Sequence, residues 1–188
     1  IHFIVFYGGG GIYIGNDSHP VIKKCEIREN QVPESAGGGI AMMESSAEIV
    51  YCLIEQNKAS SSAGIGYDTG GGLVLVNSSP TITNCIIRKN NGYNGGGLEI
   101  GYGSSPTIIN TIIAENTAGD GGGARITSCE FNSTDCLPSY PRFLHSTIVN
   151  NTAKVYRGDW GGAMRVNNKE SAVEITDCVV WGNSPDGI

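Results

Sequence analysis

Apolar and polar residues alternate in short runs along the whole chain. The segment Ile12-Tyr13-Ile14 and residues 80–87 show the two-residue period that is typical of strands with one buried face. No stretch shows the 3.6-residue period of an amphipathic helix. The pattern therefore predicts an all-β protein that is built from many short strands.

The alternating runs belong to a repeat. A run of two or three glycines followed by an apolar or small residue recurs six times, at intervals of 25 to 40 residues. The repeated blocks begin at Gly9, which is preceded by one further glycine, and at Gly37, Gly70, Gly95, Gly121 and Gly161. Glycine suits corners that need a positive φ or a close approach of two backbones, so we expect one such corner in every repeat.

A second block follows each glycine run. It has the form aliphatic-x-x-Asn and ends at Asn30, Asn57, Asn90, Asn116, Asn151 and Asn183. Five residues before each asparagine lies a small residue: Cys25, Cys52, Cys85, Thr111, Ser146 and Cys178. We expect equivalent positions to stack into columns, with the asparagine bonded to the backbone of its neighbour along the stack.

A repeat of this size, with two or three short strands, cannot bury its apolar face alone. Stacking at the strand spacing of roughly 4.8 Å closes the core, and six coils make a rod of roughly 29 Å. Residues 1–188 are thus predicted to form one domain, a single-stranded parallel β-helix of about six coils. Both ends lack a polar cap, so we expect a fragment of a longer solenoid or end-to-end self-association.

These repeats resemble two groups of proteins. The glycine and asparagine blocks are similar to those of the right-handed parallel β-helix proteins that include the pectate-lyase-like superfamily. They are also similar to the passenger repeats of chlamydial polymorphic outer-membrane autotransporters, which carry Gly-Gly-Ala-Ile and Phe-x-x-Asn, although this chain has Ile or Val at the Phe position. The resemblance implies a right-handed helix and a fold that hosts adhesins, polysaccharide lyases and glycosidases.

Net charge and hydropathy limit the classes of partner that the sequence predicts. The formal net charge is −6 and the pI is near 5.0, so the chain lacks the basic surface that dominates nucleic-acid affinity. The apolar opening from Ile1 to Tyr7 is too short to span a bilayer. We therefore expect neither a nucleic-acid partner nor a membrane span, and a glycan is the better candidate.

Loop lengths suggest a trough. Between the asparagine and the next glycine run there are twelve residues at 58–69 and nine at 152–160, but only four after Asn90 and four after Asn116. The two long loops would form walls about a floor of two coils, roughly 10 to 15 Å apart. Aromatic rings and carboxylates there would suit sugar rings and hydroxyls. The candidates are Tyr67, Asp68, Tyr93, Asn94, Asp120, Tyr156, Arg157, Asp159 and Trp160.

An outward column beside the trough holds Glu99, Arg125 and Arg165 in successive coils. Glu99 is either the counterion of Arg125 or a ligand-binding residue, and the two arginines would clamp a carboxylate or sulfate if they are not simply a surface ladder. Asp120 and Asp159 are the nearest pair for acid and base catalysis, and both residues also suit turns.

The cysteines are of two kinds. The four in the small-residue column are explained by packing alone. Cys129 and Cys136 lie in an insertion, where a disulfide would indicate an oxidising compartment. The three histidines share no spacing, so no metal site is predicted. No cofactor is expected, apart from calcium if the protein is a lyase.

The leading hypothesis is an extracellular or cell-surface module whose rigid surface binds carbohydrate or serves adhesion. The alternative is a polysaccharide lyase or glycoside hydrolase acting in the trough between loops 58–69 and 152–160, with Asp120, Asp159, Arg125 and Arg165 as catalytic candidates. A purely structural or ice-binding solenoid ranks last, because no outward column is regular. The sequence does not decide whether the protein is an enzyme.

Overall fold

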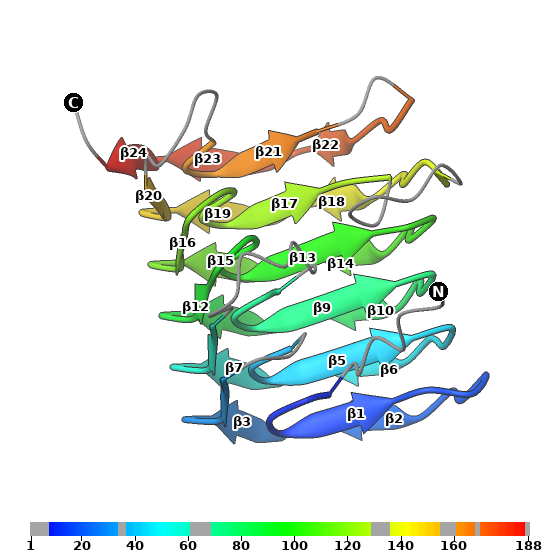
Figure 1. The fold of residues 1–188 in the computed structure, drawn as a ribbon. Helices are drawn as coiled ribbons and strands as arrows, with labels where there is room; N and C mark the ends of the chain where they lie inside the picture. Colours follow the sequence, from blue (N-terminus) through cyan, green and yellow to red (C-terminus); the bar gives the residue numbers. More distant parts are fainter. Residues whose placement is uncertain are drawn as a thin grey trace, which may run out of the picture.

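The chain winds into six stacked coils (Figure 1). The computed structural model describes residues 8–33, 37–60, 69–128, 136–154, 161–167 and 170–186. Strands of successive coils lie directly above one another, and no helix occurs in these ranges. Every strand pair is parallel, which confirms the predicted parallel β-helix of six coils.

The described strands form four sheets of six strands each, with one strand from each coil in every sheet. The first sheet consists of β1 (Ile12–Ile14), β5 (Ile40–Met43), β9 (Leu73–Val76), β13 (Leu98–Gly101), β17 (Ala124–Ile126) and β21 (Met164–Val166). The second consists of β2 (Val21–Lys23), β6 (Glu48–Val50), β10 (Thr81–Thr83), β14 (Thr107–Ile109), β18 (Arg142–Leu144) and β22 (Glu174–Thr176).

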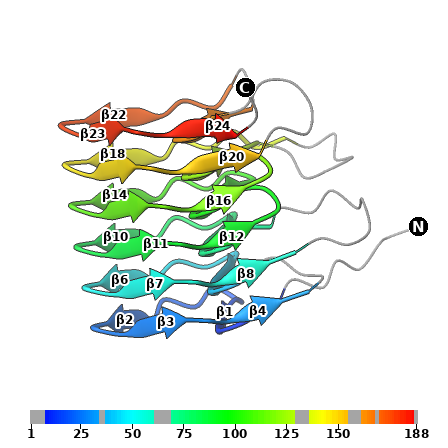
Figure 2. The same cartoon turned by 90° about the vertical axis from the view of Figure 1, so that its left-hand side faces the viewer.

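The other two sheets are visible when the molecule is turned by 90° (Figure 2). The third consists of β3 (Glu26–Arg28), β7 (Leu53–Glu55), β11 (Ile86–Arg88), β15 (Ile112–Ala114), β19 (Thr147–Val149) and β23 (Val179–Trp181). The fourth consists of β4 (Gln31–Val32), β8 (Lys58–Ala59), β12 (Asn91–Gly92), β16 (Thr117–Ala118), β20 (Thr152–Lys154) and β24 (Ser184–Asp186).

The fourth sheet corrects the sequence analysis, which expected two or three strands in each coil and treated every residue after the ladder asparagine as loop. Lys58–Ala59 and Thr152–Lys154 are strands β8 and β20, so the predicted walls 58–69 and 152–160 begin inside a sheet. Some of these strands have only two residues, which is too short for an alternating pattern to be recognised.

The core is a set of aliphatic columns. In coils two to five, the middle residue of each strand of the second and third sheets is buried; Ile82 and Ile87 in the third coil are fully buried and stack on Ile49 and Ile54 of the second. Burying an isoleucine side chain contributes roughly 1.5–3 kcal/mol. The apolar column therefore supplies the main stabilisation of each coil.

Two polar ladders follow the bends. The Asn90 side chain accepts from the backbone N–H of Asn57 and donates to the carbonyl of Ile54, at 3.0 Å each. In the small-residue column, the backbone N–H of Cys85 donates to Thr111 Oγ1 and that of Thr111 donates to Ser146 Oγ. The predicted columns are confirmed, and they satisfy backbone groups that the bends leave without a strand partner.

The glycine runs serve close approach more than positive φ. A Cβ on Gly71 would lie 2.6 Å from the carbonyl oxygen of Gly96 and 2.6 Å from backbone atoms of Asn91, so no side chain fits there. Within the runs only Gly121 has a positive φ. Left-handed backbone occurs instead at other bends, in columns such as Glu29, Gln56, Lys89, Glu115, Asn150 and Gly182.

Candidate functional site

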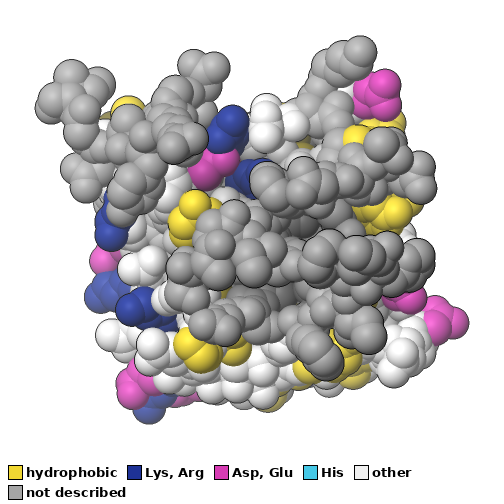
Figure 3. All heavy atoms as spheres, in the orientation of Figure 1, with side chains coloured by type: hydrophobic (Ala, Val, Ile, Leu, Met, Phe, Trp, Pro, Cys, Tyr) yellow, Lys and Arg dark blue, Asp and Glu magenta, His cyan; other side chains and the backbone are white. Residues whose placement is uncertain are grey.

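The outer face of the first sheet carries a charge cluster. Arg125 Nη1 lies 2.5 Å from Glu99 Oε1, and Arg125 Nε lies 3.1 Å from Asp120 Oδ2. Arg165 Nη1 pairs with the same Oδ2 of Asp120. Figure 3 shows basic and acidic side chains in contact on this face, over β17 and β21. Four of the predicted residues, Glu99, Asp120, Arg125 and Arg165, are thus brought together.

Glu99 is the counterion of Arg125. Glu99 is 0% exposed, and its second carboxylate oxygen accepts a hydrogen bond from the backbone N–H of Gly95 at 2.9 Å. A carboxylate that is buried and bonded in this way stabilises the corner and is not placed to contact a ligand from solvent. The counterion alternative therefore accounts for Glu99.

Asp120 is buried beside Arg125 and Arg165. The residue is 6% exposed, and its Oδ1 accepts no hydrogen bond within the described part of the chain. Burial raises the pKa of Asp120, and the opposing charges of Arg125 and Arg165 do not fully cancel this effect. The environment of Asp120 therefore favours the protonated form more than water does.

A pocket lies on the neighbouring side, where the fourth sheet turns into the next glycine corner. Its volume is about 180 Å³, and it is lined by Ala59, Ser60, Asn91, Gly92, Tyr93, Ala118, Gly119 and Lys154. We call it the Tyr93 pocket. Pockets for drug-sized ligands run from roughly 300 to 1,000 Å³, so this one accommodates a group of about the size of one sugar ring.

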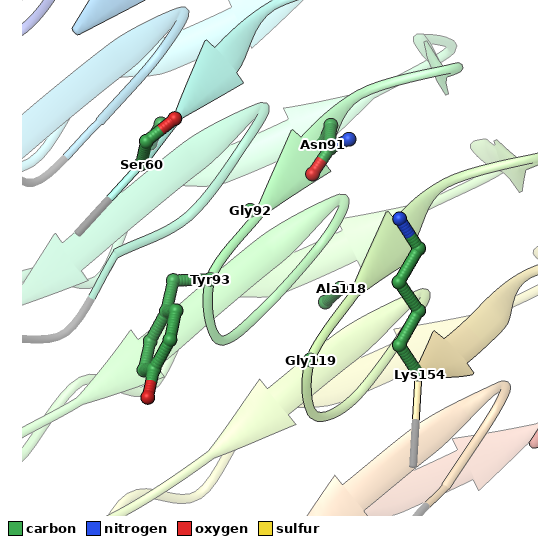
Figure 4. A pocket seen from close by; sticks show the side chains of 8 residues that line it. Ser60, Asn91, Gly92, Tyr93, Ala118, Gly119 and Lys154 are labelled. Carbon is green, nitrogen blue, oxygen red and sulfur yellow. The ribbon is translucent and has the colours of Figure 1, made fainter. Parts of the chain in front are cut away.

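Figure 4 shows how this pocket is built. Tyr93 and Lys154 lie on the two sides of Gly119 in this view, and Asn91 lies above them. Tyr93 is 46% exposed, so the ring is available to a ligand. In this view the Tyr93 ring and the Lys154 side chain point in opposite directions from the backbone. Rings of this kind can stack on sugar faces, and amide and ammonium groups can bond hydroxyls.

The pocket lies where the sequence analysis expected the floor of the trough, and Tyr93 is part of its lining. Asn94 and Asp120 do not line it. The wall candidates Tyr67, Asp68, Tyr156, Arg157, Asp159 and Trp160 lie outside the described residues, so their contribution to a trough stays a prediction.

Sequence reasoning missed Ser60, Asn91 and Lys154. Ser60, Tyr93, Gly119 and Lys154 each stand three residues after a ladder asparagine, in coils two to five. Counting from the asparagine would have predicted this column. Comparing the loops only by length concealed it.

A second cavity of about 480 Å³ lies between the first and second sheets at the N-terminal coils. It is lined by Asn16, Asp17, His19, Glu44, Ser45, Ser46, Asn77 and Ser79. The lining contains no aromatic side chain, and its two carboxylates would repel an anionic ligand. In the described ranges, no group of three or more His, Cys, Asp or Glu side chains is arranged to hold a metal ion.

The cysteines divide as the sequence suggested. Cys25, Cys52, Cys85 and Cys178 are free. Cys136 is disulfide-bonded, and its predicted partner Cys129 lies outside the described residues, so the pairing stays a prediction. Within the described segments, no helix has the length and hydropathy to cross a lipid bilayer.

Comparison with known proteins agrees with this architecture. The model of the family described as "right handed beta helix region" matches residues 10–188, which is nearly the whole chain. The protein is a parallel β-helix, and it belongs to the right-handed β-helix family. No curated protein and no solved structure gives a match.

Proposed function

We propose that this protein is a carbohydrate-binding module that works outside the cell or at the cell surface, where its rigid surface serves adhesion. The observation that carries the proposal is the Tyr93 pocket, in which a half-exposed aromatic ring lies beside small residues and polar groups. Aromatic platforms of this kind contribute roughly 0.5–1.5 kcal/mol beyond the area that they bury.

The extracellular location is supported by the disulfide at Cys136, since disulfides persist in oxidising compartments. The stacked sheets support the role of a rigid surface. Each described coil is hydrogen-bonded to its neighbours through four strands, so residues such as Ser60, Tyr93 and Lys154 are held at fixed intervals. A site on strands loses little entropy when it binds an extended ligand.

The test is a binding screen of the protein against neutral and acidic polysaccharides, by retention and then by calorimetry. Replacing the ring in Tyr93→Ala is expected to weaken binding about tenfold, which corresponds to about 1.4 kcal/mol. Tyr93→Phe keeps the ring and is expected to retain most of the affinity. Tyr140→Ala removes another exposed tyrosine outside the pocket and is the control. Unchanged binding in Tyr93→Ala would refute the proposed site.

A second candidate function, a polysaccharide lyase or glycoside hydrolase, is favoured by the contacts of Asp120 with Arg125 and Arg165. Against it, both arginines already pair with carboxylates of the chain, and acid–base cleavage needs two carboxylates that flank one bond. The same screen decides the matter if it also measures release of unsaturated or reducing ends. Turnover that is abolished in Asp120→Ala would establish an enzyme.

A further inference from the structure

One charge dominates the Tyr93 pocket. Of the eight lining residues, Lys154 is the only one with a charged side chain. This stands out in a chain with a formal net charge of −6. Lys154 is the last residue of β20 and is exposed. Among the described residues, none forms an ion pair with it. Its register partner in the next coil is Asp186. On the pocket side, the positive charge of Lys154 attracts anionic groups.

The position of Lys154 relative to Tyr93 is fixed by the register of the fourth sheet. β12 pairs with β16, and β16 pairs with β20, so Tyr93, Gly119 and Lys154 follow one another in successive coils. Two coil spacings place the aromatic ring and the start of the lysine side chain roughly 10 Å apart. Gly119, between them, has no side chain to fill the interval.

We propose that the Tyr93 pocket selects saccharides that carry an anionic substituent, a carboxylate or a sulfate. One ring stacks on Tyr93, the ligand passes over Gly119 along the coil axis, and the anionic group meets the ammonium of Lys154. The Asn91 amide lies beside this path and supplies hydrogen bonds to hydroxyls. This inference rests on the proposed function and adds the class of ligand.

The lysine side chain determines which anionic groups can bind and how salt affects their binding. Its ammonium is a compact, rotatable point charge, so it accepts carboxylate and sulfate alike, without the planar geometry that arginine requires. The interaction is at the surface and is screened by salt, with a Debye length of about 10 Å at 0.1 M. Binding of the anionic ligand should therefore weaken as salt is added, while binding of a neutral ligand should not.

The experiment compares three oligosaccharides of the same backbone and length, one neutral, one carboxylated and one sulfated. Dissociation constants are measured by calorimetry at low and at physiological salt. The wild type is expected to prefer the anionic forms about tenfold at low salt. Lys154→Gln is expected to lose this preference without a change in neutral binding, and Lys154→Arg is expected to retain it.

Two further variants complete the design. Lys23→Gln removes the same charge from an exposed strand of the second sheet and should leave the preference unchanged. Gly119→Leu places a side chain in the interval, at a glycine that is not among those with positive φ, and should weaken all three ligands at least tenfold. Circular dichroism shows whether each variant keeps the wild-type fold.

The outcomes separate the inference from the proposed function. Equal affinity of the wild type for neutral and anionic ligands, or an intact preference in Lys154→Gln, would overturn the inference and leave carbohydrate binding standing. Absence of binding to all three ligands and to the wider panel would overturn both. A preference for only one of the anionic forms would overturn the claim that Lys154 accepts carboxylate and sulfate alike.

Discussion

The side-chain oxygen of Asn116 accepts hydrogen bonds from both the backbone N–H and the side-chain amide of Asn90, one coil earlier, at 3.0 Å each. Both residues are buried. Replacing Asn116 with Ala would leave two buried donors of Asn90 without an acceptor, and each such donor costs about 1–3 kcal/mol.

We therefore expect Asn116→Ala to lower the free energy of unfolding by about 2–4 kcal/mol, as measured by urea denaturation. The matched control is Asn30→Ala in the first coil. Asn30 is half-buried and only donates to Asn57, whose oxygen keeps the backbone N–H of residue 30 as a partner. Its loss should be about 1 kcal/mol or less. Equal losses in the two variants would contradict the role of the ladder.

Gln56 is exposed and has a φ of 54°. Left-handed backbone costs an ordinary residue roughly 1–2 kcal/mol, while glycine adopts it freely but loses about 0.5–1 kcal/mol of entropy. Strain relief is the larger effect, so Gln56→Gly should stabilise the protein by about 0.5–1 kcal/mol and raise its melting temperature by about 1–4 °C. Gln56→Val should lower it, because β-branched residues tolerate this conformation poorly.

Asp120 links stability to pH. Because burial raises its pKa in the folded protein, the folded chain binds more protons than the unfolded chain between the two pKa values. The stability that Asp120 contributes is thus fully present below its unfolded pKa, near 4, and is lost as pH rises through the raised value. Urea denaturation from pH 4 to 7 should show that the free energy of unfolding of the wild type falls relative to that of Asp120→Asn as pH rises. The opposite trend would mean that the arginine charges dominate.

The free cysteines should differ sharply in reactivity. Burial raises the pKa of the Cys85 thiol to about 11, which is two units above its ordinary value and lowers its thiolate fraction about 100-fold at neutral pH. Cys25 is exposed. Iodoacetamide labelling of the native protein, read by peptide mass spectrometry, should modify Cys25 first and leave Cys85 unmodified until denaturant is added. Early labelling of Cys85 would show that the coils open locally.

Much of the fold can be predicted from the sequence because equivalent positions in successive coils carry the same type of residue. The asparagine between the third and fourth strands of every coil and the glycines before every first strand have few substitutes, so Asn90 and Gly71 can be aligned by eye. The left-handed bends are different. They are occupied by residues such as Gln56, Lys89 and Glu115, which do not favour that conformation alone. Stacking on neighbouring coils imposes it, and local preference does not reveal it.

The site was predictable only in part for a related reason. Arg125 and Glu99 hold equivalent positions on in-register strands, so their pairing follows from the repeat. Tyr93 was predicted from its residue type. Lys154 was not, because a lone lysine after a strand is ordinary until its position relative to Tyr93 is known. Its significance depends on three-dimensional order across coils and on the small size of Gly119.

The coil-by-coil register fixes the spacing of residues along the proposed binding surface in whole coils. The interval between Tyr93 and Lys154 is a whole number of coils, so loop changes within a coil cannot alter it gradually. Removing the coil that contains Gly119 would bring the two residues into adjacent positions, and inserting a coil would move them apart by roughly 4.8 Å. The spacing of ligand groups that such a surface can match therefore changes in steps, and each step is the gain or loss of one complete repeat.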